Sequence, residues 1–251
     1  MLVFNRSMGV SALVVSAFGL AGAQAQTPVA AYYFQNTLAS SVGGPTLVAV
    51  DPLAQSGFED ALISGNARRV YRFSGSSGFA NNAGLTLDTS TLIAPNVYSV
   101  EMVLSMDATT GYRRLIDVAN RSSDTGAYYD PNNHLDVYNV AAGATTVDAP
   151  LYNHVVYTVG AGTITAYLNG VQEFSVNSAL MDINNPANLL TFFLDDGINE
   201  YSSGRIALLR VYNQVLTGDQ VATLAQNPFI PAPGTALLAS LGILATARRR
   251  R

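Results

Sequence analysis

The amino-acid sequence predicts an all-β protein, with two packed antiparallel sheets of jelly-roll type followed by one short amphipathic helix. Three observations predict this fold class. Short segments rich in Val, Ile, Tyr and Thr are separated by turn residues at the spacing of about 8–12 residues typical of sandwiches and barrels. Two of these segments alternate apolar and polar residues with a period of two. A single segment, close to the end of the β-rich region, carries the signals of a helix.

The clearest strands are residues 97–106 and 163–176. In 97–106, Ser99, Glu101 and Ser105 alternate with apolar residues, and only Val103 breaks a pattern that predicts a half-buried strand. Residues 163–168 alternate in the same way and lead into Asn169-Gly170, a strong hairpin signal, because both central positions of a type I′ turn require a positive φ. Further strands are predicted at 29–34, 68–73, 112–119, 126–130, 134–139, 154–159, 189–195 and 204–212.

The predicted helix begins at Thr217. Gln220 follows three residues later, as in a capping box, and Asp219 in the first turn favours the helix dipole. Pro228 ends the helix, because proline disfavours α geometry in the residue before it. The apolar face consists of Val221, Leu224 and Ala225.

The amino-acid composition excludes several kinds of functional site and partner. The chain has 251 residues and no Cys, which excludes disulfides, thiolate metal sites and a cysteine nucleophile. Residues 26–230 hold 8 Arg and all 17 acidic residues, a net charge of −9. No nucleic-acid partner is expected, because nucleic-acid binding requires a basic surface.

Residues 1–25 have the layout of a secretory signal peptide, with Arg6 before an apolar run. Small residues at Ala23 and Ala25 give a cleavage motif, so the mature chain is expected to begin at Gln26 outside the cytoplasm. The alternative is a short N-terminal membrane helix. In either case, residues 26–228 are expected to form the β-domain.

Residues 229–251 form a distinct tail, in which Pro231, Ala232 and Pro233 precede an apolar run and four terminal arginines. The apolar residues 234–247 would form a helix of about 21 Å, short of the hydrocarbon core of about 30 Å. Arginines after such a helix stay on the cytoplasmic side. We expect a transient inner-membrane intermediate; the alternative is an ordinary core helix. The membrane-stop residues are Arg248, Arg249, Arg250 and Arg251.

Two loops carry candidate binding residues. Asp195, Asp196, Asn199 and Glu200 are clustered oxygen donors, which suit Ca²⁺. A second loop could hydrogen-bond and stack sugars through Tyr129, Asp130, Asn132 and Asn133. Both sets are also what a solvated turn contains, and this alternative stays open.

The chain offers no obvious catalytic residues. A glycosidase requires two carboxyl groups that face one bond, and we interpret Glu101 as an outward-facing sheet residue. His134 follows a turn and is expected to be solvated. No catalytic residue is assigned.

Three stretches together resemble the LamG-like branch of the concanavalin A-like lectin/glucanase superfamily: the strand–loop–strand of 97–138, "YNHVVYTVGAGTITAYLNGVQEF" and "SSGRIALLRVYNQVLTGDQVATLAQ". The resemblance implies a jelly roll, with a structural role for His154. It also implies the pattern Glu-x-Asp-x-x-Glu in the catalytic members, and here Val103 stands where the Asp would follow Glu101.

The tail resembles the PEP-CTERM sorting signal, also called the ice-binding protein C-terminal domain, although Ala232 replaces the usual Glu. This resemblance implies an exosortase-like membrane protease as a partner, and an envelope or extracellular destination. Together the features predict an exported, non-catalytic module that binds an extracellular glycan or matrix protein. The alternatives are a glycan hydrolase or lyase on the same scaffold, and a structural matrix protein without a specific ligand.

Overall fold

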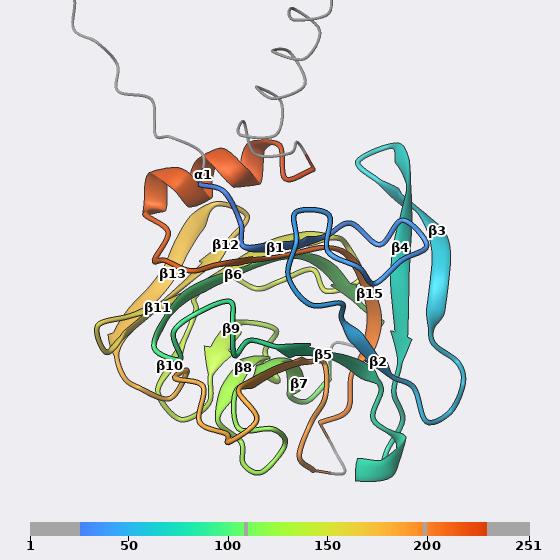
Figure 1. Ribbon diagram of the computed structural model, residues 1–251, viewed down its shortest axis with the longest axis horizontal. Helices are drawn as coiled ribbons and strands as arrows, with labels where there is room; N and C mark the ends of the chain where they lie inside the picture. The colour runs from blue at the N-terminus through green and yellow to red at the C-terminus, as the bar shows by residue number, and fades with distance from the viewer. Residues whose placement is uncertain (1–25, 108–109, 198–199, 230–251) are drawn as a thin grey trace, which may run out of the picture.

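The computed structural model describes residues 26–107, 110–197 and 200–229, which form two antiparallel β-sheets packed face to face (Figure 1). A short helix, α1 (Gly218–Gln226), lies against the outer face of the larger sheet. The all-β sandwich with one short helix that the sequence predicts is confirmed. The predicted terminal helices lie outside the described residues.

The larger sheet has eight strands, with β6 and β15 at its centre. Strand β1 (Ala30–Tyr32) pairs with β15 beside the main path of the sheet. The order along this path is β13 (Val171–Asn177), β12 (Thr163–Leu168), β11 (Asn153–Gly160), β6 (Val97–Met106), β15 (Ser203–Tyr212), β4 (Asn66–Ser74) and β3 (Gly57–Ile63).

The smaller sheet has seven strands. Its order is β10 (Ala141–Ala142), β9 (Leu135–Val137), β8 (Gly126–Tyr129), β7 (Arg113–Asp117), β14 (Leu189–Phe192), β5 (Gly84–Asp88) and β2 (Val48–Val50). A single turn of 3-10 helix, η1 (Phe79–Asn81), lies in the chain just before strand β5.

Strand β6 shows how the alternating pattern builds the core and where it misleads. Its apolar positions from Tyr98 to Met106 point into the space between the sheets, as the period of two predicts. The opposite face of β6 is also covered, so every residue from Tyr98 to Met106 is buried, and the half-buried strand that we predicted is wrong. Val103 breaks the alternating pattern because it faces outward and packs in a second apolar cluster with Ile63 and Leu208.

Helix α1 builds part of the second layer on that outer face. The predicted capping box is present: the Thr217 hydroxyl accepts from the Gln220 N–H, and the Gln220 side chain accepts from the Thr217 N–H. Val221 is buried in a third apolar cluster with Tyr212 and Leu216. The loss of one such cap costs about 1 kcal/mol.

The predicted Asn169-Gly170 hairpin joins β12 to β13. Asn169 has φ of 50° and Gly170 has φ of 86°, so both central residues are left-handed, as a type I′ turn requires. Gly170 also lies under α1, where an added Cβ would come within 2.9 Å of the Ala225 Cβ. Glycine at this position therefore serves both the turn and the packing of the helix.

Both ends of the described chain lie on the outer side of the eight-stranded sheet (Figure 1). The side chain of Gln26 hydrogen-bonds that of Gln214 just before α1, and the guanidinium of Arg68 lies 3.6 Å above the ring of Phe229. Among the described residues, no helix has the length and apolar character needed to cross a membrane. The predicted processing residues Ala23, Ala25, Pro231, Ala232 and Pro233 and the four terminal arginines lie outside the described residues.

Candidate functional site

A row of large polar and aromatic side chains crosses the outer face of the seven-stranded sheet. Arg114 on β7 pairs in register with Tyr128 on β8, which pairs in turn with Asp136 on β9. Residues opposite one another on neighbouring strands share a face, so these three side chains are adjacent. The neighbouring apolar residues of these strands, such as Leu115 and Ala127, enter the core instead.

Two more tyrosines extend this row at the strand ends. The ring of Tyr112, just before β7, meets Tyr128 at 5.7 Å and Tyr138 at 5.5 Å, both nearly edge to face. Tyr128 is fully buried, whereas Tyr112 and Tyr138 are partly exposed. We call the surface formed by Tyr112, Tyr128, Asp136 and Tyr138 the tyrosine face.

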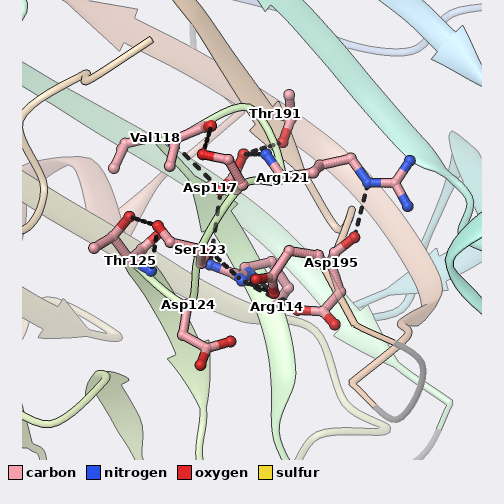
Figure 2. A network of polar contacts seen from close by, with 12 residues as sticks. Arg114, Asp117, Val118, Arg121, Ser123, Asp124, Thr125, Thr191 and Asp195 are labelled. Atoms are coloured by element: carbon pink, nitrogen blue, oxygen red, sulfur yellow. Dashed lines mark hydrogen bonds and ion pairs between the residues drawn. The ribbon is translucent and has the colours of Figure 1, made fainter.

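Arg114 contacts the tyrosine face from the adjacent strand β7 and connects it to the neighbouring loops. Its side chain is fully buried, and its guanidinium lies 4.2 Å from the centre of the Tyr128 ring. It donates to Asp195 Oδ1 at 3.1 and 3.2 Å and to Asp196 Oδ1 at 3.0 Å. Figure 2 shows Arg114 between the Ser123–Thr125 segment and Asp195; it also donates to the carbonyl oxygens of Ser123 and Thr125. One side chain therefore ties strand β7 to two loops.

A second buried acid continues the same network (Figure 2). Asp117 accepts from the Thr191 hydroxyl at 3.0 Å and from the Arg121 N–H at 2.9 Å. Burial raises the pKa of Asp117, while the hydrogen bond from Arg121 and the charge of Arg114 act in the opposite direction. The Arg121 side chain donates to the Asp195 carbonyl at 2.7 Å, so both arginines fix the same loop.

Two carboxyl groups around the tyrosine face have raised pKa values. Burial, reinforced by Asp130, raises the pKa of Asp136 to about 6, and its Oδ1 has no hydrogen-bond partner in the described part of the chain. Burial, reinforced by Asp195 and other acids, raises the pKa of Glu200 to about 7. The pKa of Tyr112 is raised by burial and then by Asp136, Tyr138, Asp130 and Glu200, so both carboxyls lie near its ring.

The predicted sugar-binding residues are only in part where a ligand could reach them. The prediction that Tyr129 contacts a sugar is wrong, because its side chain points into the core with 1% exposure. Adjacent residues of a strand face opposite sides, and Tyr128 occupies the outer one. Asp130 is 6% exposed and accepts from the N–H groups of Asn132 and His134, at 2.8 and 2.7 Å.

The rest of that loop is a turn beside the tyrosine face. Asn132 is exposed, and Asn133 is partly exposed with a left-handed φ of 62°. His134 is partly exposed, with Nδ1 at 3.4 Å from the Asp130 carboxylate. Sugar binding by Asp130, Asn132 and Asn133 stays a prediction.

The predicted calcium ligands are engaged elsewhere. Asp195 is fully buried: its Oδ1 accepts from Arg114, and its Oδ2 accepts from the Gly197 N–H at 2.7 Å. Asp196 also pairs with Arg114, Glu200 is partly buried, and Asn199 lies outside the described residues. No group of three or more His, Asp or Glu that could hold a metal ion occurs within 26–107, 110–197 and 200–229. Calcium binding stays a prediction in which the ion must compete with Arg114.

Glu101 lies on the other sheet and faces outward from the core between the sheets, as predicted, but this outer face is itself covered. Glu101 is therefore fully buried beneath the second layer. Its carboxylate accepts from Arg210 at 3.2 Å, from Tyr212 at 2.5 Å and from His154 Nε2 at 3.0 Å. Such a carboxylate cannot reach a glycosidic bond, and the Nε2 atom of His154 makes a structural contact with it, in line with the role that the resemblance implies.

Sequence reasoning missed the principal residues of the tyrosine face: Tyr112, Arg114, Tyr128, Asp136 and Tyr138. The available signal was the alternation in "GAYYD" and "HLDVYN", where one residue of each adjacent pair must face outward. The pairing of β7, β8 and β9 was needed to bring these residues together.

A comparison with protein families matches residues 79–222, more than half of the chain, to the Concanavalin A-like lectin/glucanases superfamily. Among solved structures, Domain 4 of AbnA, a GH43 extracellular arabinanase from Geobacillus stearothermophilus in complex with arabinotriose, is similar with a TM-score of 0.61 and 21% identity. The alignment covers 80% of this chain and 98% of that domain.

The binding domain of botulinum neurotoxin DC is also similar, with a TM-score of 0.57 and 14% identity. It was solved in complexes with rat synaptotagmin II and with SialylT. The alignment covers 80% of this chain but 51% of the toxin domain, so the chain spans about half the length of that relative. At these identities the likenesses show the fold alone. A comparison with curated proteins finds no match.

Proposed function

The chain belongs to the concanavalin A-like lectin/glucanases superfamily, and we propose that it is a non-catalytic module that binds a neutral glycan on the tyrosine face. The observation that carries the proposal is the cluster of Tyr112, Tyr128 and Tyr138 beside Asp136. Aromatic rings with a few placed polar groups are what small ligand sites use.

The tyrosine face offers both contacts that a sugar needs. The partly exposed rings of Tyr112 and Tyr138 stand at 86° to each other and can cover the apolar C–H face of a sugar ring. The phenol groups of Tyr112 and Tyr138, both partly exposed, can exchange hydrogen bonds with sugar hydroxyls. Arg114 keeps Tyr128 and the neighbouring loops fixed, so the site is preorganised.

The charges around the face favour a neutral glycan over an acidic one. Asp130, Asp136 and Glu200 all act on Tyr112, and Arg114, whose guanidinium contacts the Tyr128 ring, is already paired with Asp195 and Asp196. An anionic sugar would meet like charge at short range. The arabinotriose complex of the AbnA domain supports glycan binding on this scaffold.

The proposal includes export and sorting. Residues 1–25 would direct export, and residues 229–251 would hold the domain in the inner membrane until an exosortase-like protease removes the tail. Both described ends lie on the side of the eight-stranded sheet, and the tyrosine face lies on the opposite sheet (Figure 1). A domain held by its tail would therefore present the tyrosine face away from the tether. Intact mass of the mature protein tests this step, and a species that still ends at Arg251 would contradict it.

A glycan array tests the proposed binding. We expect the purified chain to bind one or more neutral oligosaccharides, and the Tyr112→Ala/Tyr138→Ala double variant to lose that binding. Val171→Ala is the control, since Val171 is an apolar residue with 65% exposure on β13 of the other sheet. Binding of no glycan, or equal binding by the double variant, would contradict the proposal.

A hydrolase on the same scaffold is the second candidate, and the raised pKa values of Asp136 and Glu200 are the observation that favours it. If the chain were such an enzyme, depolymerisation of a bound polysaccharide would disappear in Glu200→Gln while binding persisted. We expect binding without turnover, because the carboxyl pattern of the superfamily's glucanases is absent from β6.

A further inference from the structure

A cavity of about 400 Å³ lies on the outer face of the eight-stranded sheet, on the opposite side of the molecule from the tyrosine face. The β3–β4 hairpin, the start of β11 and the end of α1 enclose it. Its volume is in the range of about 300–1,000 Å³ that is typical of small-molecule sites.

His154 lines this cavity and carries an unused hydrogen-bonding atom. The side chain is 5% exposed, and Nδ1 has no hydrogen-bond partner within the described residues. A buried polar atom without a partner costs about 1–3 kcal/mol, so the atom calls for an explanation. A bound ligand would supply the missing partner.

The Glu101 cluster fixes which ring nitrogen of His154 is left for a ligand. Although burial opposes it, the hydrogen bond from His154 and the charge of Arg210 hold the pKa of Glu101 below its usual range. An ionised carboxylate only accepts hydrogen bonds, so the Nε2 atom of His154 must donate to it across 3.0 Å. The free Nδ1 atom is an acceptor in a neutral ring and a donor in a charged one, and a ligand hydroxyl can serve as the partner of either form.

Two other residues of the cavity wall add polar groups. The Arg68 guanidinium lies over the Phe229 ring and forms no ion pair with any described residue. The buried Tyr152 hydroxyl has no hydrogen bond of ordinary geometry among the described residues, although Ser105 lies nearby. The cavity therefore offers a cation, a phenolic hydroxyl and a histidine ring nitrogen, and its wall also includes Ser64, Asn66, Asn169, Gln226 and Asn227.

Apolar side chains complete the wall. Ile63, Val103 and Phe229 line the cavity beside these polar groups. Flat apolar contact combined with a few directional hydrogen bonds suits a small ring with hydroxyls on its edge. The arginine adds a requirement for negative charge, and a carboxylate matches its planar donors.

We propose that this cavity binds a free hexuronic acid. Arg68 would hold the carboxylate, His154 Nδ1 and the Tyr152 hydroxyl would bind ring hydroxyls, and Phe229 and Val103 would cover the C–H face. This second site takes an acidic sugar, goes beyond the neutral-glycan site and does not depend on it.

Histidine-selective ¹⁵N labelling provides a direct test, because the chain contains two histidines. Galacturonic acid is titrated into the full chain, and the ring nitrogens are followed by NMR. The Nδ1 signal of His154 should shift in a saturable way. The signals of His134, on the β8–β9 turn of the other sheet, should not move. Galactose and propionate, which lack the carboxylate or the hydroxyls, are the comparison ligands.

Two charge-removing variants locate the carboxylate. Arg68→Gln should weaken galacturonate binding by roughly tenfold or more, the equivalent of one charge-assisted hydrogen bond. Arg69→Gln, which removes the same charge from the next residue of β4 and does not line the cavity, should leave the affinity unchanged. Tyr152→Phe should weaken binding by a smaller factor.

An unshifted His154 signal would overturn the proposal, as would equal binding of galactose or propionate, or equal affinity of Arg68→Gln and wild type. These outcomes are independent of the glycan array, because the tyrosine face lies on the other sheet. Loss of array binding with intact galacturonate binding would reject the proposed function and leave this inference standing.

Discussion

Arg114 is the residue on which the architecture of the tyrosine face depends most, and Arg114→Met tests that role. Methionine keeps much of the length of the side chain and removes the charge. The change leaves the fully buried carboxylate of Asp195 without its cation and removes the contact with the Tyr128 ring. Removal of one partner from a buried ion pair costs about 3–5 kcal/mol.

The expected loss is large enough to measure by urea denaturation and by calorimetry. At roughly 2–4 °C per kcal/mol for a domain of this size, the melting temperature should fall by roughly 6–20 °C. Arg72→Met is the matched control, because Arg72 pairs with Asp107 at 2.7 Å while both side chains stay partly exposed, at 28% and 31%. An exposed pair of this kind contributes about 0–1 kcal/mol.

A double variant separates the loss of the charge pair from the loss of packing. Arg114→Met/Asp195→Asn removes both charges, so it should recover part of the stability that Arg114→Met loses. If Arg114→Met and Arg72→Met were equally stable, or if the second substitution only added to the damage, Arg114 would not be the ionic centre of this network.

Three further predictions follow from the structure. Gly170→Ala should destabilise by about 1–3 kcal/mol more than Gly162→Ala in urea denaturation, because both have positive φ but only Gly170 would press a Cβ against α1; equal losses would contradict the packing argument. Folding raises the pKa of Glu200 from 4.5 to about 7, so the folded state binds more protons than the unfolded state between these values. Stability should therefore fall as pH rises from about 4.5 to about 7, and Glu200→Gln should flatten this fall in pH-dependent denaturation; an unchanged slope would show that Glu200 does not titrate in this way. Melting curves with added Ca²⁺ and with chelator test the predicted calcium site, where the ion must displace Arg114 from Asp195 and Asp196; a rise in melting temperature with Ca²⁺ would support the site, and coincident curves would contradict it.

The sequence was sufficient to predict the structural features that depend on interactions between residues close together in the chain. The alternation along 97–106, the Asn169-Gly170 turn and the Thr217 to Gln220 capping box each depend on residues within a few positions of one another. Strand β3 was missed because it lies at the edge of its sheet: its residues are mostly partly exposed, so no apolar stripe marks it. Edge strands carry little hydrophobic signal for that reason.

The candidate site could not be predicted, because distant segments build it. Arg114 and Asp195 are 81 residues apart in sequence and meet only when β7 and β14 are neighbours. The pair Tyr128-Tyr129 predicts that one ring faces outward but does not say which. Glu101 faces away from the core, as predicted, yet its burial depends on a second layer to which segments distant in sequence contribute.

Titration of the strongest neutral oligosaccharide from the array against wild type and the Tyr112→Ala/Tyr138→Ala double variant tests the central claim most directly. If the two rings form the binding surface, their joint removal should raise Kd by roughly thirtyfold or more, the effect of losing a binding hot spot of about 2 kcal/mol. Val171→Ala should bind like wild type. A double variant that remains folded and binds with unchanged Kd would show that the glycan lies elsewhere and would contradict the account.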